Sequence, residues 1–137
     1  MKLFCAILIL LFVTGCNKTH TALKEQIVNS DSVAINFFKG DGTMDTVVAV
    51  RIIRDKILIN QLADLITEKK IDIKTNCGFD GSLHFFKMNQ VIQDVNFVIQ
   101  DKGCSQFSFK LITDNHWEAT GLSYVAKTLL LDFKNHP

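Results

Sequence analysis

The chain has 137 residues, with 15 Lys and Arg against 14 Asp and Glu and a formal net charge of +1. This length corresponds to one domain. The balanced charge gives no indication of nucleic-acid binding, or of a basic patch that would hold anionic lipid headgroups. Eleven Phe residues are enough to build a hydrophobic core.

Residues 1–15 have the pattern of a secretory leader. Met1 and Lys2 form a short positive start, and the run from Leu3 to Val13 contains no polar side chain. As a helix this run would be about 16 Å long, whereas a bilayer core requires about 20 residues. A buried core helix would show a polar stripe, which is absent here. The run therefore predicts a signal peptide.

The leader ends in the residues Val13-Thr14-Gly15-Cys16. The motif "VTGC" resembles the lipobox of bacterial lipoproteins, with Val in place of the commoner Leu. This resemblance covers residues 1–16 only. It implies cleavage before Cys16, a diacylglycerol on the Cys16 sulfur and an acylated new N-terminus. Two or more acyl chains hold a protein stably on a membrane.

The lipobox resemblance also implies a location. Residue 17 is Asn rather than Asp, which by resemblance to enterobacterial sorting implies the outer membrane. Residues 17–20 contain no acidic run of the kind that resembles a surface-export tag, so we expect the periplasmic face. We expect residues 16–32 to be the lipidated N-terminus and a polar tether, with at most a short helical turn around residues 23–28. Residues 33–137 are then a single domain.

The first half of the domain reads as a hairpin and a helix. Residues 33–38 and 46–53 alternate in β-branched and aromatic residues, which predicts two strands. Asp41 and Asp45 flank the intervening turn, where Asp-Gly chemistry explains them better than a cation loop. Asp55 stands at an N-cap position. Apolar residues at helical spacing follow it and predict a helix of about 12 to 14 residues, ending near Lys69-Lys70.

The second half begins with a predicted hairpin of residues 82–87 and 91–99. A three-residue loop, 88–90, pairs Leu83 with Val95 and His84 with Asp94. A two-residue loop would set the apolar Leu83 against the charged Asp94 instead, so the longer loop is favoured. Residues 105–112 form the next strand, and residues 117–119 are a candidate short return strand. Apolar residues recur at helical spacing from Leu122 to Phe133, which predicts a second helix.

The resulting order is ββαβββ(β)α. Strands in hairpins indicate an antiparallel sheet, and both amphipathic helices must bury their apolar stripes. The sequence therefore predicts an α+β fold, with an antiparallel sheet of about five strands and two helices packed on it.

Cysteine usage agrees with an oxidising compartment. If Cys5 leaves with the leader and Cys16 carries lipid, Cys77 and Cys104 remain as a pair. Their disulfide would close a loop of roughly 28 residues and contribute roughly 3.5 kcal/mol in the chain-entropy model. It would join the segment entering strand 82–87 to the segment entering strand 105–112. Two buried free thiols are the alternative, and the spacing does not match a metal or redox motif.

The sequence contains no motif for catalysis. A His84–Asp94 pair could orient a base, but no motif places a nucleophile beside it. The G-x-S-x-G, H-E-x-x-H and phosphate-loop patterns are absent. We therefore expect no enzyme, no cofactor and no metal.

A binding surface is the remaining candidate site. One face of the sheet is expected to mix aromatic and polar groups, as recognition surfaces do: Phe38, His84, Phe86, Ile92, Asp94, Asn96, Val98 and Lys110. The alternative is that the second helix or the tether covers this face. The expected function is a non-enzymatic binding domain on an envelope lipoprotein, with a protein partner. The alternatives are a periplasmic inhibitor or immunity protein against an envelope-targeting effector, and a small hydrolase or small-ligand binder.

Overall fold

The structure is a computed structural model that describes residues 19–41, 43–44 and 46–136. The predicted leader, residues 1–15, and the predicted lipidation site Cys16 lie outside these residues. The described chain forms an antiparallel sheet of seven strands with three helices, in the order α1 β1 β2 α2 β3 β4 β5 β6 β7 α3. The prediction of an α+β fold with an antiparallel sheet is confirmed. The described residues form seven strands, where about five and a candidate return strand were predicted, and three helices instead of two.

The strands and helices of the first half are close to the predicted ranges. Strands β1 (Ser32–Phe38) and β2 (Val47–Ile53) form the first hairpin. Helix α2 (Lys56–Thr67) begins at Asp55, whose carboxylate accepts from the N–H groups of Ile57 and Leu58 at 2.8 and 3.2 Å. This is the predicted N-cap.

The second half is an antiparallel meander followed by a helix. Strands β4 (Gly81–Lys87), β5 (Gln90–Val98), β6 (Gln106–Lys110) and β7 (Trp117–Gly121) pair in sequence. Strand β3 (Lys70–Ile71) pairs with the far side of β7. The order across the sheet is β2-β1-β4-β5-β6-β7-β3. Helix α3 (Tyr124–Asn135) begins at Ser123, whose hydroxyl accepts from the N–H of Ala126.

The described part of the predicted tether belongs to the fold. Residues Thr21–Val28 form helix α1, and Leu23 and Ile27 are fully buried in the core. The prediction of a tether up to residue 32 was therefore wrong for residues 19–32. Two buried apolar residues spaced by four on an eight-residue helix give a short stripe, which the polar neighbours obscured.

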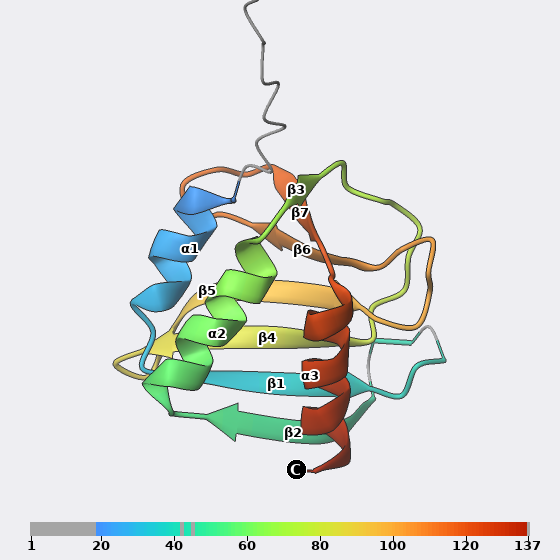
Figure 1. Ribbon diagram of the computed structural model, residues 1–137, viewed down its shortest axis with the longest axis horizontal. Helices are drawn as coiled ribbons and strands as arrows, with labels where there is room; N and C mark the ends of the chain where they lie inside the picture. Colours follow the sequence, from blue (N-terminus) through green and yellow to red (C-terminus); the bar gives the residue numbers. More distant parts are fainter. Residues whose placement is uncertain (1–18, 42, 45, 137) are drawn as a thin grey trace, which may run out of the picture.

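The three helices of the described chain all lie on one face of the sheet (Figure 1). The core fills the space between the two layers. Its largest fully buried side chains come mainly from alternate positions of the strands, and include Ile35, Phe37, Leu83, Phe85, Phe97, Phe107 and Phe109. The described residues include no helix long and apolar enough to cross a membrane.

The connection from β3 to β4, residues 72–80, covers part of the other face. The Gln106 side chain lies on that face and makes two hydrogen bonds to the backbone of Lys74, at 2.8 and 2.9 Å. Val98, which is paired with Gln106, is only 1% exposed. The expectation that Val98 belongs to an open surface was therefore wrong. On β2 and β4 the outward side chains of Ile52, His84 and Phe86 are exposed or half-buried, so this part of the face is open.

The predicted disulfide is present in the structure. Cys77 and Cys104 are bonded, with their Cα atoms 5.9 Å apart. The bond joins the 72–80 connection to the segment that enters β6, as the sequence predicted. It therefore ties the covering segment to the sheet beneath it.

Candidate functional site

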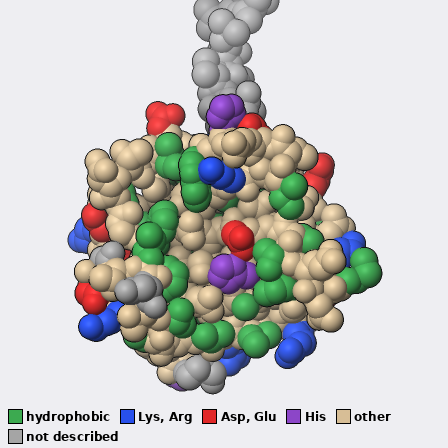
Figure 2. Space-filling view, turned by 180° about the vertical axis from the view of Figure 1, so that it is seen from behind, with side chains coloured by type: hydrophobic (Ala, Val, Ile, Leu, Met, Phe, Trp, Pro, Cys, Tyr) green, Lys and Arg blue, Asp and Glu red, His purple; other side chains and the backbone are tan. Residues whose placement is uncertain are grey.

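The candidate surface is the face of the sheet opposite the helices. Residues directly paired across the ladder point to the same side, so the register identifies its members. One row contains Ile52, Ala34, His84 and Asp94, and the next contains Val50, Asn36, Ser82, Asn96 and Ser108. We call the part over β2, β1, β4 and the adjoining end of β5 the open face. Figure 2 shows the molecule from behind, with hydrophobic side chains spread around a histidine and an acidic group near the centre of this side.

Six of the eight predicted residues have exposed or half-buried side chains on the face away from the helices. The exceptions are Val98, which is covered, and Ile92, which is partly buried and packs against the core. Phe38, Phe86 and Asn96 are half-buried, as is His84, whereas Asp94 and Lys110 are exposed. None of the three described helices covers them, and α1, which belongs to the predicted tether, packs on the opposite face, so the described helices do not turn this face into core. Lys110 lies apart from the two phenylalanines, on β6, where it packs over the ring of its pairing partner Trp117 at 5.2 Å.

Exposed apolar side chains form the edge of the open face on β2. Val50 is 49% exposed and Ile52 is 53% exposed. Val47 on the same strand and Val91 on β5 are exposed to a similar degree. Sequence reasoning missed the contribution of β2, because its alternating pattern fixes two faces but does not say which neighbours cover each.

A linear hydrogen-bond network lies at the centre of the open face. The Ser82 hydroxyl lies 2.9 Å from His84 Nε2, and His84 Nδ1 lies 2.6 Å from an Asp94 carboxylate oxygen. The His84–Asp94 pairing was predicted from the register and is confirmed. Ser82 was not predicted as a partner, although residues i and i+2 of a strand share a face, and this spacing was the available signal.

The order Ser82–His84–Asp94 is that of a nucleophile, a base and an orienting carboxylate. Acyl transfer also needs donors aimed at the developing oxyanion and a pocket that holds the substrate. The backbone N–H groups of β4 are used in its ladders with β1 and β5. Asn36 and Asn96 flank Ser82 in the ladder, and their side-chain amides are two donors close to it.

A hollow of about 290 Å³ lies beside this network rather than over it. Asp94, Asn96, Lys110, Ile112 and Trp117 are among its lining residues, whereas Ser82 and His84 are not. Ser82 itself is 5% exposed. The network is therefore not enclosed by a substrate pocket. Its polar groups are hydrogen-bonded to one another within a largely apolar surface.

The part of the chain that the structure describes contains no group of three His, Cys, Asp or Glu side chains placed to hold a metal ion. Asp41 in the β1–β2 turn accepts a hydrogen bond from the backbone N–H of Thr43 at 3.0 Å and another from the Thr43 hydroxyl. These two bonds, the hydroxyl bond foremost, lower the pKa of the Asp41 carboxyl. They are turn contacts of the expected Asp type, whereas Asp45 lies outside the described residues.

Comparisons of this chain with protein-family models, with curated proteins and with solved structures gave no match.

Proposed function

We propose that the protein is a lipid-anchored lipoprotein of the bacterial envelope, whose non-enzymatic domain binds another envelope protein through the open face of its sheet. The leader of residues 1–15 and the "VTGC" motif ending at Cys16 support the anchor. Asn17 supports the outer membrane, with the domain on its periplasmic side. The Cys77–Cys104 disulfide fits an oxidising compartment.

The open face is the observation on which this function depends. Antiparallel sheets that face solvent on one side normally alternate apolar and polar residues, with the polar ones outward. Here the outward positions of β2 carry Val47, Val50 and Ile52, all exposed, and those of β1 and β4 include Phe38 and Phe86. Apolar and aromatic side chains around a small polar centre are typical of protein-binding surfaces.

Site-specific photocrosslinking in living cells tests this proposal. A photoreactive amino acid replaces Ile52 on the open face in one variant, and Val125 in the matched control. Val125 is 62% exposed on α3, in the helical layer. We expect the Ile52 position to give a discrete adduct with one envelope protein and the Val125 position to give none. Because the surface is proposed to bind next to the membrane, Cys16→Ser should reduce the adduct by mislocalising the protein.

Two results would contradict the proposal. One is that both positions give the same adducts, which would mean random collision rather than docking. The other is that neither position gives an adduct while the protein is folded and abundant. Acylation is measured separately, from the mass of the N-terminal peptide, so that a failure of anchoring is not mistaken for a failure of binding.

A small serine hydrolase is the second candidate function, and the Ser82–His84–Asp94 chain favours it. In that case Ser82 would attack an ester carbonyl carbon while His84 Nε2 accepts the hydroxyl proton and returns it to the leaving alcohol. Water would then release the acyl group. A fluorophosphonate probe distinguishes the two functions, because it labels an activated serine. Labelling that is lost in Ser82→Ala and in His84→Gln would favour the hydrolase, and an unlabelled folded protein would exclude it.

A further inference from the structure

The chain joins the fold at His20, whose position is fixed by several contacts. This side chain is 2% exposed. Its Nδ1 accepts the N–H of Leu23 at 3.2 Å, which caps α1, and its Nε2 lies 2.5 Å from a Glu118 carboxylate oxygen on β7. Its backbone N–H donates to the Thr67 carbonyl at 2.9 Å, and its ring packs edge-to-face on Phe109. The direction from which the chain enters the domain is therefore set at residue 20.

Only three residues separate His20 from Cys16. Four residue steps of fully extended chain reach at most about 14 Å. Acyl chains on Cys16 would lie in the hydrocarbon core, and the headgroup layer outside that core is roughly 5 to 8 Å thick. The connection can therefore extend at most about 9 Å beyond the headgroup layer, so the domain stays close to the membrane surface, with its His20 end facing the lipid.

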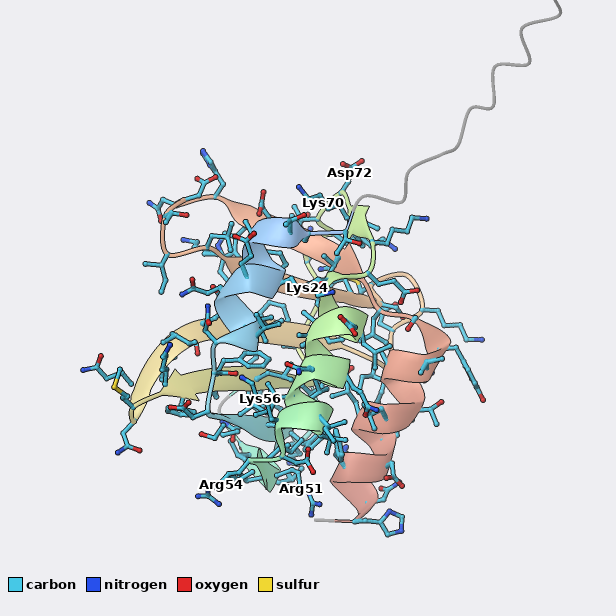
Figure 3. All side chains as sticks on the ribbon, turned by 60° about the vertical axis from the view of Figure 1, so that its left-hand side comes forward. Lys24, Arg51, Arg54, Lys56, Lys70 and Asp72 are labelled. Atoms are coloured by element: carbon cyan, nitrogen blue, oxygen red, sulfur yellow. A yellow bond between two sulfur atoms is a disulfide. The ribbon has the colours of Figure 1, made fainter. Side chains whose placement is uncertain are left out.

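The surface around His20 is the β3–β7 edge of the sheet. His20 lines a shallow hollow together with Lys70, Ile73 and Trp117. Figure 1 shows β3 and β7 at the end of the molecule where α1 begins, and Figure 3 shows Lys70 and Asp72 at the same end. We call Lys69, Lys70, Ile73 and Trp117 the tether-side edge.

The chemistry of the tether-side edge suits a headgroup layer. Trp117 is 48% exposed, and tryptophan favours the membrane–water interface. Lysine side chains can extend their charged ends toward headgroups while their stems cover apolar surface. Lys69 and Lys70 are exposed, but Glu68 and Asp72 beside them are exposed as well. Contact should therefore depend on the anchor and on Trp117 rather than on anionic lipid.

We infer that the tether-side edge is a membrane-contact surface, on which the domain stands with Trp117 in the headgroup layer. This inference rests on the proposed anchoring at Cys16. It places β2 six strand spacings from β3, or about 29 Å from the lipid at about 4.8 Å per spacing. The plane of the sheet is then roughly perpendicular to the membrane, and the open face is accessible to a partner in the periplasm.

Trp117 is the only tryptophan of the chain, so its fluorescence reports on this edge directly. The full-length lipoprotein, purified from membranes in detergent, is added to preformed phosphatidylcholine vesicles that contain lipids brominated near the glycerol end of their acyl chains. We expect the fluorescence of Trp117 to fall by about half relative to unbrominated vesicles, because the ring sits at the interface. Replacing a quarter of the lipid with phosphatidylglycerol should leave the quenching unchanged.

The matched control moves the tryptophan to β2, the strand at the opposite edge of the sheet. In the double variant Trp117→Phe, Ile52→Trp the indole replaces a side chain that is 53% exposed, close to the 48% of Trp117. Strand β2 lies five spacings from β7, about 24 Å at about 4.8 Å each. We expect no quenching at position 52. Equal quenching at the two positions, or none at Trp117, would overturn the inferred orientation.

The mass of the N-terminal peptide separates this outcome from a failure of the anchor. If Cys16 carries acyl chains and Trp117 is not quenched, the orientation is wrong and the anchor stands. If Cys16 carries no acyl chain, the anchor fails and the orientation that rests on it fails too.

Discussion

At the scale of single residues, His20 is the side chain on which the N-terminal end of the fold depends most. It combines an N-cap, a contact with Glu118 and packing against Phe109. The Nδ1 atom must be unprotonated to accept the Leu23 N–H, so the neutral ring with its proton on Nε2 fits both hydrogen bonds. Sequence reasoning placed His20 in a tether, because a lone histidine before a weak apolar stripe gives no packing signal.

We predict that His20→Ala destabilises the protein by about 2 to 3 kcal/mol, since loss of a cap alone costs about 1 kcal/mol and a buried ring is removed as well. His20→Asn should recover about 1 kcal/mol of this, because Asn is among the best N-cap residues. Urea unfolding at pH 8 measures both values. Equal stability of the Ala and Asn variants would show that the cap contributes nothing, and wild-type stability of His20→Ala would show that the contacts of the ring do not matter.

At the scale of elements, the β4–β5 hairpin shows what sequence patterns determine. The pairings Leu83 with Val95 and His84 with Asp94 are those predicted. The predicted three-residue loop was wrong, because Lys87 pairs with Gln90 across a two-residue turn of Met88 and Asn89, both with positive φ. A bulge on β5 opposite Phe85 and Phe86 leaves Ile92 as an extra, unpaired residue and restores the predicted register. Burial of alternate side chains fixed the outcome, whereas the local turn geometry was not visible in the pattern.

The elements missed by the sequence analysis are the short ones. Strand β3 has two residues, and α1 has eight. Pattern periods cannot be counted over such lengths, and both elements depend on partners distant in sequence. Dependence on distant parts of the chain also explains why the His84–Asp94 pair was predicted and the exposure of β2 was not. A pair within one hairpin follows from local register, but whether Ile52 is covered depends on where helices from the rest of the chain pack.

At the scale of the whole molecule, the helices decide which face of the sheet is available. All three described helices pack on the face that carries Ile35, Leu83 and Phe107, so the apolar residues of the other face need a different cover. The 72–80 connection lies over part of that face, where it is hydrogen-bonded to Gln106 on β6 and held by the Cys77–Cys104 disulfide. The helices thus cover one face of the seven-stranded sheet, and the other face is covered only in part. The uncovered part is the surface proposed to bind a partner.

The same arrangement makes α1 part of the domain, which a truncation series tests. We predict that a chain beginning at Thr19 folds as the full chain does, whereas one beginning at Val33 does not. Removing α1 uncovers the core beneath Leu23 and Ile27, both 0% exposed, and full burial of each contributes about 1.5 to 3 kcal/mol. The two together contribute about 3 to 6 kcal/mol, which is comparable to the lower end of the stability of about 5 to 15 kcal/mol that is typical of a small domain.

Leu23→Ala gives a milder variant of the same test, with an expected cost of about 2 to 5 kcal/mol. The matched control is Ala22→Gly, next to it on the exposed side of α1, with an expected cost of at most about 1 kcal/mol because only helix propensity changes. Circular dichroism during urea unfolding follows all four chains. If the chain beginning at Val33 unfolded at the same urea concentration as the chain beginning at Thr19, α1 would be a tether after all. The short connection from Cys16 to His20 would then no longer hold the domain against the membrane.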